Sequence, residues 1–214
     1  LIRDSLTAAR EEVAAQAAAA ELEVLARHRT MLEEQVLAAF RSMRAAGQRV
    51  PRLGVPPCGD AGRARAVLEA ALEDVCTLSP AELPNATAAG NYAKAGECLQ
   101  WLATIPSVHP ATICRAGAYV PAMRGDKVKA LFGEQRDALV AWCRVMGEEY
   151  LARVAVVAST LLDRFVGIYA ALKAEREALD FADLEIEAIS LLESSGRRSR
   201  EPLYLLVDEF QDTN

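Results

Sequence analysis

Aromatic residues, histidines and closely spaced cysteines are scarce in this chain of 214 residues. Phe, Trp and Tyr make up only 6% of the residues and Ala is abundant, so we expect many helices that pack closely through small side chains. The two histidines, His28 and His109, lie far from any other candidate ligand and are interpreted as ordinary helix or loop residues. The cysteines have no metal-ligand spacing, so we expect reduced thiols in a cytoplasmic protein; they are Cys58, Cys76, Cys98, Cys114 and Cys143.

Membrane-spanning and secretory segments are also missing from the sequence. We find no apolar stretch of the length needed to cross a membrane and no signal peptide, and we expect no membrane association. The formal net charge of -6 argues against a protein that coats nucleic acid by bulk charge, but it leaves room for a local basic face. Hydrophobic residues make up 52% of the chain, which is enough for a sizeable core.

Helical periodicity dominates the sequence as far as residue 193. Residues 4 to about 46 predict one long helix or two abutting helices, capped by Asp4 or Ser5 and stopped by Gly47. Because the large apolar residues do not keep a strict heptad, we favour a helical hairpin over a dimeric coiled coil. Further helices are predicted at 60–77, 91–105, 126–145, 148–179 and 181–193, with a cap at Asp180 and at most a short helix within 106–125.

Several basic and aromatic residues have two possible roles. Arg41, Arg44, Arg49 and Arg52 either compensate the dipole at the end of the first helical stretch or contact phosphates. Lys127 and Lys129 lie in a first helical turn, the unfavourable end for a cation, which leaves surface placement and phosphate contact both open. For Trp101 we favour a place in the core over a platform for base stacking.

The closing segment combines an apolar run with adjacent acids. Residues 203–207 read Leu-Tyr-Leu-Leu-Val, which suits a strand buried on both faces of a parallel sheet. Asp208 and Glu209 follow directly, at the strand end where open α/β sheets place ligands. The alternative to a ligand-binding role for these two acids is a buried strand that ends in a solvated acidic turn.

Two strings carry a resemblance to a known family. Residues 207–214, Val-Asp-Glu-Phe-Gln-Asp-Thr-Asn, resemble motif II, the Walker B element, of the UvrD/Rep-like superfamily 1 DNA helicases. Tyr169, Lys173 and the string Leu-Asp-Phe-Ala-Asp-Leu at 179–184 resemble the Tyr-x-x-x-Lys…Leu-Asp-Phe-x-Asp-Leu segment that precedes this motif. The Ala-rich helices before Tyr169 look more like the large AddA/RecB-type helicase–nuclease subunits than the compact UvrD proteins.

The resemblance implies a mainly α fold in two parts. Residues 1–165 would form a helical bundle insertion, similar to subdomain 1B of the family. Residues 166–214 would return into a partial RecA-like α/β domain that ends in the Walker B strand. The resemblance rests on specific wording over residues 169–214 and only on helical character and position before them.

The resemblance also implies roles for four residues of the closing segment in binding ATP and Mg²⁺. Asp208 would hold the metal ion, and Glu209 would orient and deprotonate the water that attacks the γ-phosphate. Gln211 would sense the γ-phosphate and couple hydrolysis to motion on single-stranded DNA. Asp212 would support the polar network of the site.

The sequence of the chain contains no phosphate-binding loop. No Gly-x-x-x-x-Gly-Lys-Ser/Thr string occurs in the chain, and the arginines expected downstream of motif II are absent. Because the chain opens on Leu1 and stops inside a motif, we expect a piece of a longer protein that does not hydrolyse ATP alone. Residues 203–207 would then lack their sheet neighbours and be frayed, packed along a helix or paired with another copy.

Two functional hypotheses follow. The leading one is a fragment of an ATP-dependent DNA helicase from recombination or repair, whose helical insertion contacts single-stranded DNA and duplex junctions, with a nuclease subunit as a candidate partner. The alternative is a non-catalytic helical protein–protein interaction module whose closing segment matches motif II by chance.

Overall fold

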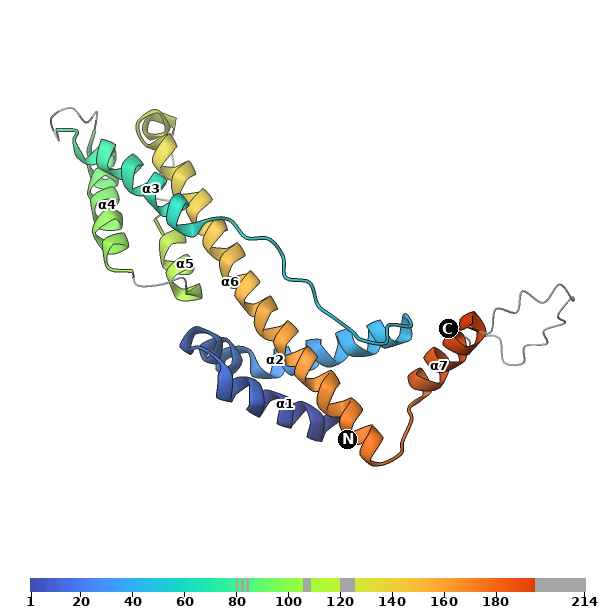
Figure 1. Ribbon diagram of the computed structural model, residues 1–214. Helices are drawn as coiled ribbons and strands as arrows, with labels where there is room; N and C mark the ends of the chain where they lie inside the picture. The colour runs from blue at the N-terminus through green and yellow to red at the C-terminus, as the bar shows by residue number, and fades with distance from the viewer. Residues whose placement is uncertain (80, 82, 84, 106–108, 120–125, 195–214) are drawn as a thin grey trace, which may run out of the picture. The chain divides into compact units, whose positions relative to one another are not determined.

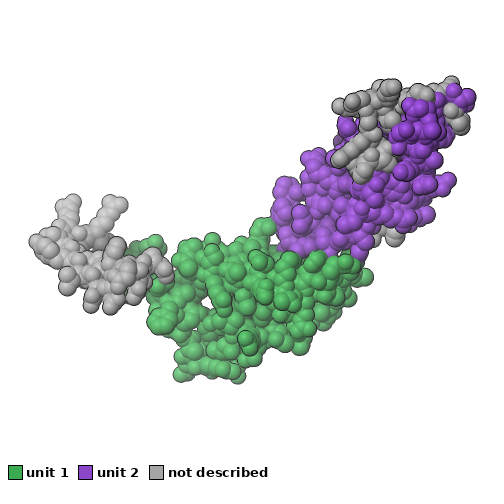
Figure 2. All heavy atoms as spheres, turned by 180° about the vertical axis from the view of Figure 1, so that it is seen from behind, with its two compact units in different colours: residues 1–54, 156–214 green, residues 55–155 purple. Residues whose placement is uncertain are grey.

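The computed structural model describes residues 1–79, 81, 83, 85–105, 109–119 and 126–194, with the backbone alone at 126–131. The chain divides into two compact units, unit 1 with residues 1–54 and 156–214 and unit 2 with residues 55–155 (Figure 2). Every regular element in the described ranges is a helix, which confirms the mainly α prediction. The predicted strand at 203–207 lies outside the described residues, and the boundary predicted at residue 165 stays a prediction.

Unit 1 begins with two consecutive helices, α1 (Ile2–Gln16) and α2 (Ala19–Ala45) (Figure 1). The backbone becomes extended at Ala17 and Ala18 and separates the helices, so the second of the two predicted alternatives, two abutting helices, is found. An ion pair of 2.7 Å between Arg10 Nη1 and Glu33 Oε1 links them. These contacts within one chain agree with the predicted helical hairpin.

The two ends of this helical stretch differ in how well they were predicted. The predicted cap at Asp4 or Ser5 is wrong, because α1 already begins at Ile2. Asp4 lies in the first turn and accepts a hydrogen bond of 3.2 Å from the amine of Leu1. Gly47 ends α2 as predicted, with a φ of +78° that favours glycine.

The core of unit 1 is built by α2 and the second part of α6 (Asp126–Glu175). Separate helices were predicted at 126–145 and 148–179, but α6 is continuous, because a glycine such as Gly147 in a helix interior costs only about 1 kcal/mol. Buried side chains recur along α6 from Phe132 to Tyr169 and do not concentrate in its apolar middle, where Val156 is 39% exposed. The buried residues include Val24, Leu25, Leu32, Val36, Phe40, Val157, Leu161, Leu162, Phe165 and Tyr169.

Helix α6 also corrects the expectation that no stretch could cross a membrane. Its portion from Phe132 to Glu175 is long and apolar enough to do so by length and composition. Core helices of water-soluble proteins meet the same two criteria, and this portion buries Leu161, Leu162 and Phe165 within unit 1. Length and composition alone therefore do not assign α6 to a membrane.

Unit 2 contains α3 (Ala61–Cys76), α4 (Ala86–Ala103), α5 (Pro110–Gly117) and the first part of α6. Asp60, the predicted first residue of this helix, caps α3 and accepts a hydrogen bond of 2.9 Å from the Arg63 amide. Helix α4 starts earlier than the predicted residue 91, because Asn85 accepts a hydrogen bond of 2.9 Å from the Ala88 amide and caps it there. The short α5 agrees with the prediction for 106–125.

The core of unit 2 is mainly aliphatic. Its buried residues include Leu68, Leu72, Val75, Leu102, Phe132, Leu139, Trp142 and Met146. Val67 of α3 lies outside this core and is 56% exposed. Trp101 is half-buried at the edge of this core, stacks on Tyr119 at 5.9 Å between ring centroids and lies under the Arg115 guanidinium, which agrees in part with the favoured core placement.

Helix α7 (Phe181–Ser194) returns to unit 1 and exposes much of its surface. Among its side chains only Ile186 is buried. Phe181, Leu184, Leu191 and Leu192 are between 51% and 87% exposed and recur at helical spacing along one face. The described part of the chain therefore leaves this apolar face of α7 uncovered.

Candidate functional site

The most concentrated group of ionised side chains lies where α6, α7 and α2 meet in unit 1. It contains two cations and two carboxylates beside a tyrosine hydroxyl, and we call it the α6–α7 charge cluster. Its members are Arg44, Tyr169, Lys173, Asp180 and Asp183. Four of them belong to the second string of the family resemblance, and Arg44 joins them from the last turn of α2.

Asp180 and Asp183 hold the start of α7 through reciprocal hydrogen bonds. The Asp183 amide donates to Asp180 Oδ1 at 2.8 Å, and the Asp180 amide donates to Asp183 Oδ2 at 3.0 Å. This is the geometry of a capping box, in which two otherwise unpaired amides of a helix start are satisfied. The predicted cap at Asp180 is confirmed, and Asp183 completes it.

Lys173, in the last turn of α6, bridges both carboxylates. Its Nζ donates to Asp180 Oδ2 at 3.0 Å and makes a shorter ion pair with Asp183 Oδ2. The side chain of Lys173 is only 12% exposed, and its Nζ lies 4.6 Å from the centroid of the Tyr169 ring. The Tyr169 hydroxyl donates to Asp180 at 3.2 Å. Tyr169 and Lys173 therefore act on the same carboxylate from successive turns of α6.

Arg44 joins the cluster from the last turn of α2. Its Nη2 donates to Asp183 Oδ1 at 2.5 Å and lies 3.6 Å from Asp180 Oδ1. Its Nη1 donates to the carbonyls of Gln48 and Arg49, each at 3.5 Å. With a side chain that is 10% exposed, Arg44 ties the end of α2 to the start of α7.

Three aromatic side chains pack against one another beside the cluster. Phe40 meets the edge of Phe165 at 5.0 Å and of Tyr169 at 5.7 Å between ring centroids, and Phe165 stacks on Tyr169. Such contacts fix ring orientation, so the Tyr169 hydroxyl is directed at Asp180 by packing. A hollow of about 360 Å³ borders the cluster, lined partly by Phe40, Arg41 and Phe181.

The surroundings shift the pKa of three cluster members. Burial alone raises the pKa of Asp180, but hydrogen bonds from Lys173, the Asp183 amide and Tyr169 outweigh it and lower the pKa to about 2. Burial lowers the pKa of Lys173, whereas its hydrogen bonds to Asp183 and Asp180 outweigh burial and raise it. Burial and the Asp180 charge raise the pKa of Tyr169. Lys173 and Asp180 are therefore ionised at neutral pH.

The cluster is already neutralised and does not offer a metal site. Two cations face two carboxylates, so neither carboxylate is left to balance a divalent ion. Among the residues that the structure describes, no three His, Cys, Asp or Glu side chains are placed to hold a metal ion. We interpret the cluster as a rigid joint between helices.

The predicted nucleotide and metal ligands lie elsewhere in the chain. Asp208, Glu209, Gln211 and Asp212 fall outside the described residues, as do the side chains of Lys127 and Lys129. Their roles stay predictions. Among the basic residues with two possible roles, Arg49 forms an exposed ion pair with Glu187 at 3.3 Å, and Arg44 belongs to the cluster.

Sequence reasoning missed the part that Arg44 plays. Its place before Gly47 indicated a cation at a helix end, which is compatible with many roles. Its carboxylate partner, Asp183, lies 139 residues further along the chain. No local pattern connects residues at that separation.

We compared the chain with known protein families, curated proteins and solved structures. Residues 142–214 match the family model described as UvrD/REP helicase N-terminal domain. Neither the curated proteins nor the solved structures that were compared with the chain gave a match. The matched range contains α7, most of the charge cluster and the closing acidic string. The match supports the interpretation of this chain as a UvrD-like helicase fragment.

Proposed function

We propose that the chain forms part of an ATP-dependent DNA helicase of the UvrD/Rep type that acts in recombination or repair. The observation that carries this proposal is the family match over residues 142–214, which includes the string Val-Asp-Glu-Phe-Gln-Asp-Thr-Asn at 207–214. Within the family, the Ala-rich helices favour an AddA/RecB-type subunit in the cytoplasm, beside a possible nuclease partner. ATP and Mg²⁺ are the cofactors that this function requires.

The exposed face of α7 supports the proposed RecA-like part. A helix that covers a sheet buries one apolar stripe against it, and α7 presents such a stripe through Phe181, Leu184, Leu191 and Leu192. Its opposite side packs on unit 1 through Ile186 and the charge cluster. An apolar layer from the remainder of the protein would complete this arrangement.

The proposed chemistry belongs to the closing segment. Asp208 holds Mg²⁺, which neutralises charge on the phosphates, and Glu209 orients the attacking water and takes its proton. Gln211 contacts the γ-phosphate, and Asp212 holds the neighbouring polar groups in place. The phosphate-binding loop comes from a part of the protein outside these 214 residues, since no such string occurs among them.

The helical part supplies the proposed DNA contact. Arg41 and Arg52 are exposed and lie at the end of α2 and in the segment after it, where no carboxylate pair has been found for them in the described ranges. Phosphate contacts position a protein on DNA without reading its sequence. This fits an acidic chain with a local basic face.

Binding to forked DNA tests the DNA contact. We expect the 214-residue chain to bind a forked duplex with a dissociation constant that rises with salt, and the double variant Arg41→Glu/Arg52→Glu to bind at least ~10-fold more weakly. Arg27→Glu, on the same helix, is the matched control. Binding no stronger than that of an acidic control protein would contradict the proposed contact.

A further inference from the structure

A second group of arginines in unit 1 lines a hollow of about 370 Å³ between α1 and α2. We call this hollow the α1–α2 groove. Its lining includes Arg3, Thr7, Arg10, Arg29, Glu33 and Glu34. None of these residues belongs to the α6–α7 charge cluster, and none is part of the contact proposed for Arg41 and Arg52.

Helical spacing and one shared carboxylate bring the arginines together. Arg3, Thr7 and Arg10 follow one another at about one helical turn, so they lie on the same side of α1. Arg10 Nη1 and Arg29 Nε both donate to Glu33 Oε1, at 2.7 Å and 3.3 Å. Glu33 therefore holds one guanidinium from each helix beside the other.

The α1–α2 groove carries more positive than negative charge, although the chain as a whole has a net charge of -6. Three arginines line it, against the two carboxylates of Glu33 and Glu34. Arg10 and Arg29 each bond to Glu33 through a single nitrogen, and a guanidinium has five N–H donors. Arg3 is exposed and pairs with no carboxylate in the described ranges. The groove therefore offers cationic donors to an anionic ligand.

The distribution of the arginines favours a ligand with repeated charges over one compact anion. Arg3 and Arg10 are separated by seven residues of α1, which is about 10 Å along the helix axis at 1.5 Å per residue. A strand of duplex DNA carries one phosphate per about 3.4 Å of its axis, so about three phosphates pass over that distance. No aromatic side chain lines the groove, so it provides no platform on which a base could stack.

We infer that the α1–α2 groove binds the phosphodiester backbone of DNA through Arg3, Arg10 and Arg29. The identification of the polyanion as DNA rests on the proposed function, whereas the preference for a polyanion rests on the groove itself. The exposed Thr7 hydroxyl adds an uncharged donor of the kind that contacts phosphates. Binding through the backbone alone should be independent of base sequence and should weaken steeply as salt is added.

The test is fluorescence anisotropy of labelled single-stranded and duplex DNA with the 214-residue chain over a series of salt concentrations. We expect Arg3→Glu/Arg29→Glu to raise Kd at least ~10-fold and to reduce the slope of log K against log salt by about 2, because two phosphate contacts are lost. Arg10 is left in place, since its ion pair links the helices. Arg63→Glu/Arg144→Glu makes the same charge change at exposed positions of unit 2 and should change Kd by less than ~3-fold. A Kd of Arg3→Glu/Arg29→Glu equal to that of this control would overturn the inference.

A variant that gains affinity separates binding in the groove from a loss of folding. Glu34→Gln removes a negative charge from the lining and should lower Kd by about 2- to 5-fold, which unfolding cannot cause. An unchanged Kd for Glu34→Gln would count against the groove. Displacement of the DNA by poly-glutamate at an equal concentration of charge would show that the groove takes an acidic polypeptide, and the assignment to phosphates would be wrong.

The remaining outcomes distinguish the groove from the proposed function. DNA binding that is lost in Arg41→Glu/Arg52→Glu but unchanged in Arg3→Glu/Arg29→Glu overturns the groove alone. DNA binding that depends on Arg3 and Arg29, in a protein whose complete form keeps its full ATPase rate as Asp208→Asn, overturns the proposed helicase chemistry and leaves the groove. A wild-type chain that binds no DNA overturns both the groove and the contact at Arg41 and Arg52.

Discussion

Asp180 shows how a single side chain can serve three purposes at once. It caps α7, accepts hydrogen bonds from Tyr169 and Lys173, and balances part of the positive charge of Arg44. Each of these interactions favours the ionised carboxylate, and together they exceed the cost of its partial burial. The stability of unit 1 should therefore depend on the charge of this residue.

The pH dependence of unfolding tests that dependence. The pKa of Asp180 falls from 3.8 to about 2 on folding, so the folded state binds fewer protons and the contribution is complete above about pH 4. It is lost as the pH falls toward about 2 and amounts to about 1 kcal/mol after solvent screening. Urea unfolding of wild type and Asp180→Asn should give a difference that shrinks from pH 5 to pH 2.5. A stability difference that stays constant over this pH range would contradict the prediction. Leu191→Ala is the control variant.

The cysteines should differ widely in reactivity. Burial raises the pKa of Cys98 to about 12, aided by the nearby Cys143, and burial raises the pKa of Cys143 to about 11. Cys58 and Cys114 are exposed. Because the thiolate is the reactive form, we expect a disulfide reagent at pH 8 to modify Cys58 and Cys114 first and Cys98 and Cys143 at least ~100-fold more slowly. Equal rates in the folded chain would refute this, and urea should make all five equal.

Local chemistry at single residues was predictable where the partner lies nearby in the chain. Asp180 was predicted as a cap because a cap binds an amide only a few residues away. The pairing of Arg44 with Asp183 was not predictable, because it requires the path of the whole chain between α2 and α7. The roles of Asp208 and Glu209 are still inferred from the sequence alone.

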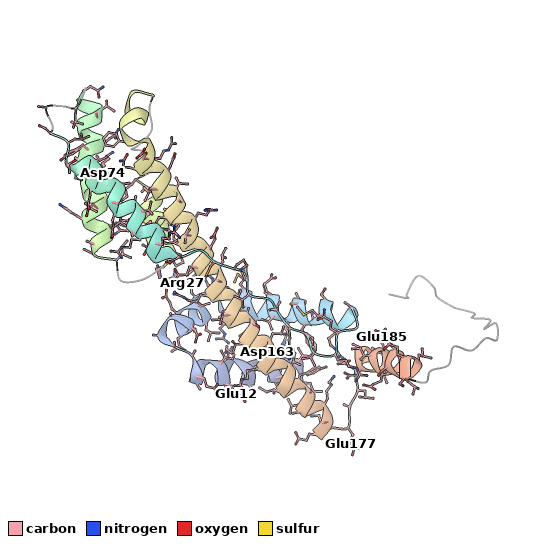
Figure 3. All side chains as sticks on the ribbon, turned by 45° about the horizontal axis from the view of Figure 1, so that its top comes forward. Glu12, Arg27, Asp74, Asp163, Glu177 and Glu185 are labelled. Atoms are coloured by element: carbon pink, nitrogen blue, oxygen red, sulfur yellow. The ribbon has the colours of Figure 1, made fainter. Side chains whose placement is uncertain are left out.

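Helix ends differ in how well the sequence suits the backbone. Both α2 and α6 are followed by a residue with positive φ, which is Gly47 at +78° after α2 but Glu177 at 50° after α6. Glu177 lies just beyond the end of α6 (Figure 3). A side chain in this conformation is strained, whereas glycine is not. The sequence predicted the stop at Gly47 for this reason, and it gave no such signal near Glu177.

Substitutions at Glu177 and at Gly47 should change the free energy of unfolding in opposite directions. We expect Glu177→Gly to raise the free energy of unfolding by about 0.5–1 kcal/mol because strain is removed. Gly47→Ala should lower it by about 1 kcal/mol, and since no atom lies within 4 Å of the added Cβ the effect comes from the backbone alone. Urea denaturation measures both. A destabilised Glu177→Gly variant would show that the Glu177 side chain makes a contribution larger than its strain.

The apolar face of α7 should make the 214-residue chain self-associate. Large exposed apolar patches favour association, and Leu184 and Leu191 are 51% and 70% exposed on this face. Sedimentation velocity at micromolar concentration should show less association for Leu184→Ser/Leu191→Ser than for wild type. Val67→Ser, at an exposed position of α3, is the control. Unchanged association of the α7 variant would mean that this face is covered by something else.

At the scale of the whole molecule, the helical class was predictable but the continuity of α6 was not. Apolar periodicity identified the helices, because each buries one side against a neighbour. Two separate helices were predicted at 126–145 and 148–179, yet α6 runs as one helix from Asp126 to Glu175. The family match covers residues 142–214, so the assignment of the remaining helices to the same protein family rests on their position in the chain.

The most direct test is DNA-stimulated ATP hydrolysis by the protein that the complete gene encodes. We predict a hydrolysis rate that rises with single-stranded DNA. The rate should fall by at least ~100-fold in Asp208→Asn, which removes the proposed metal ligand, and in Glu209→Gln, which removes the proposed base. Glu193→Gln, an exposed carboxylate on α7, should keep the wild-type rate. A protein without ATPase activity, or one whose rate is unchanged in both variants, would contradict the helicase account.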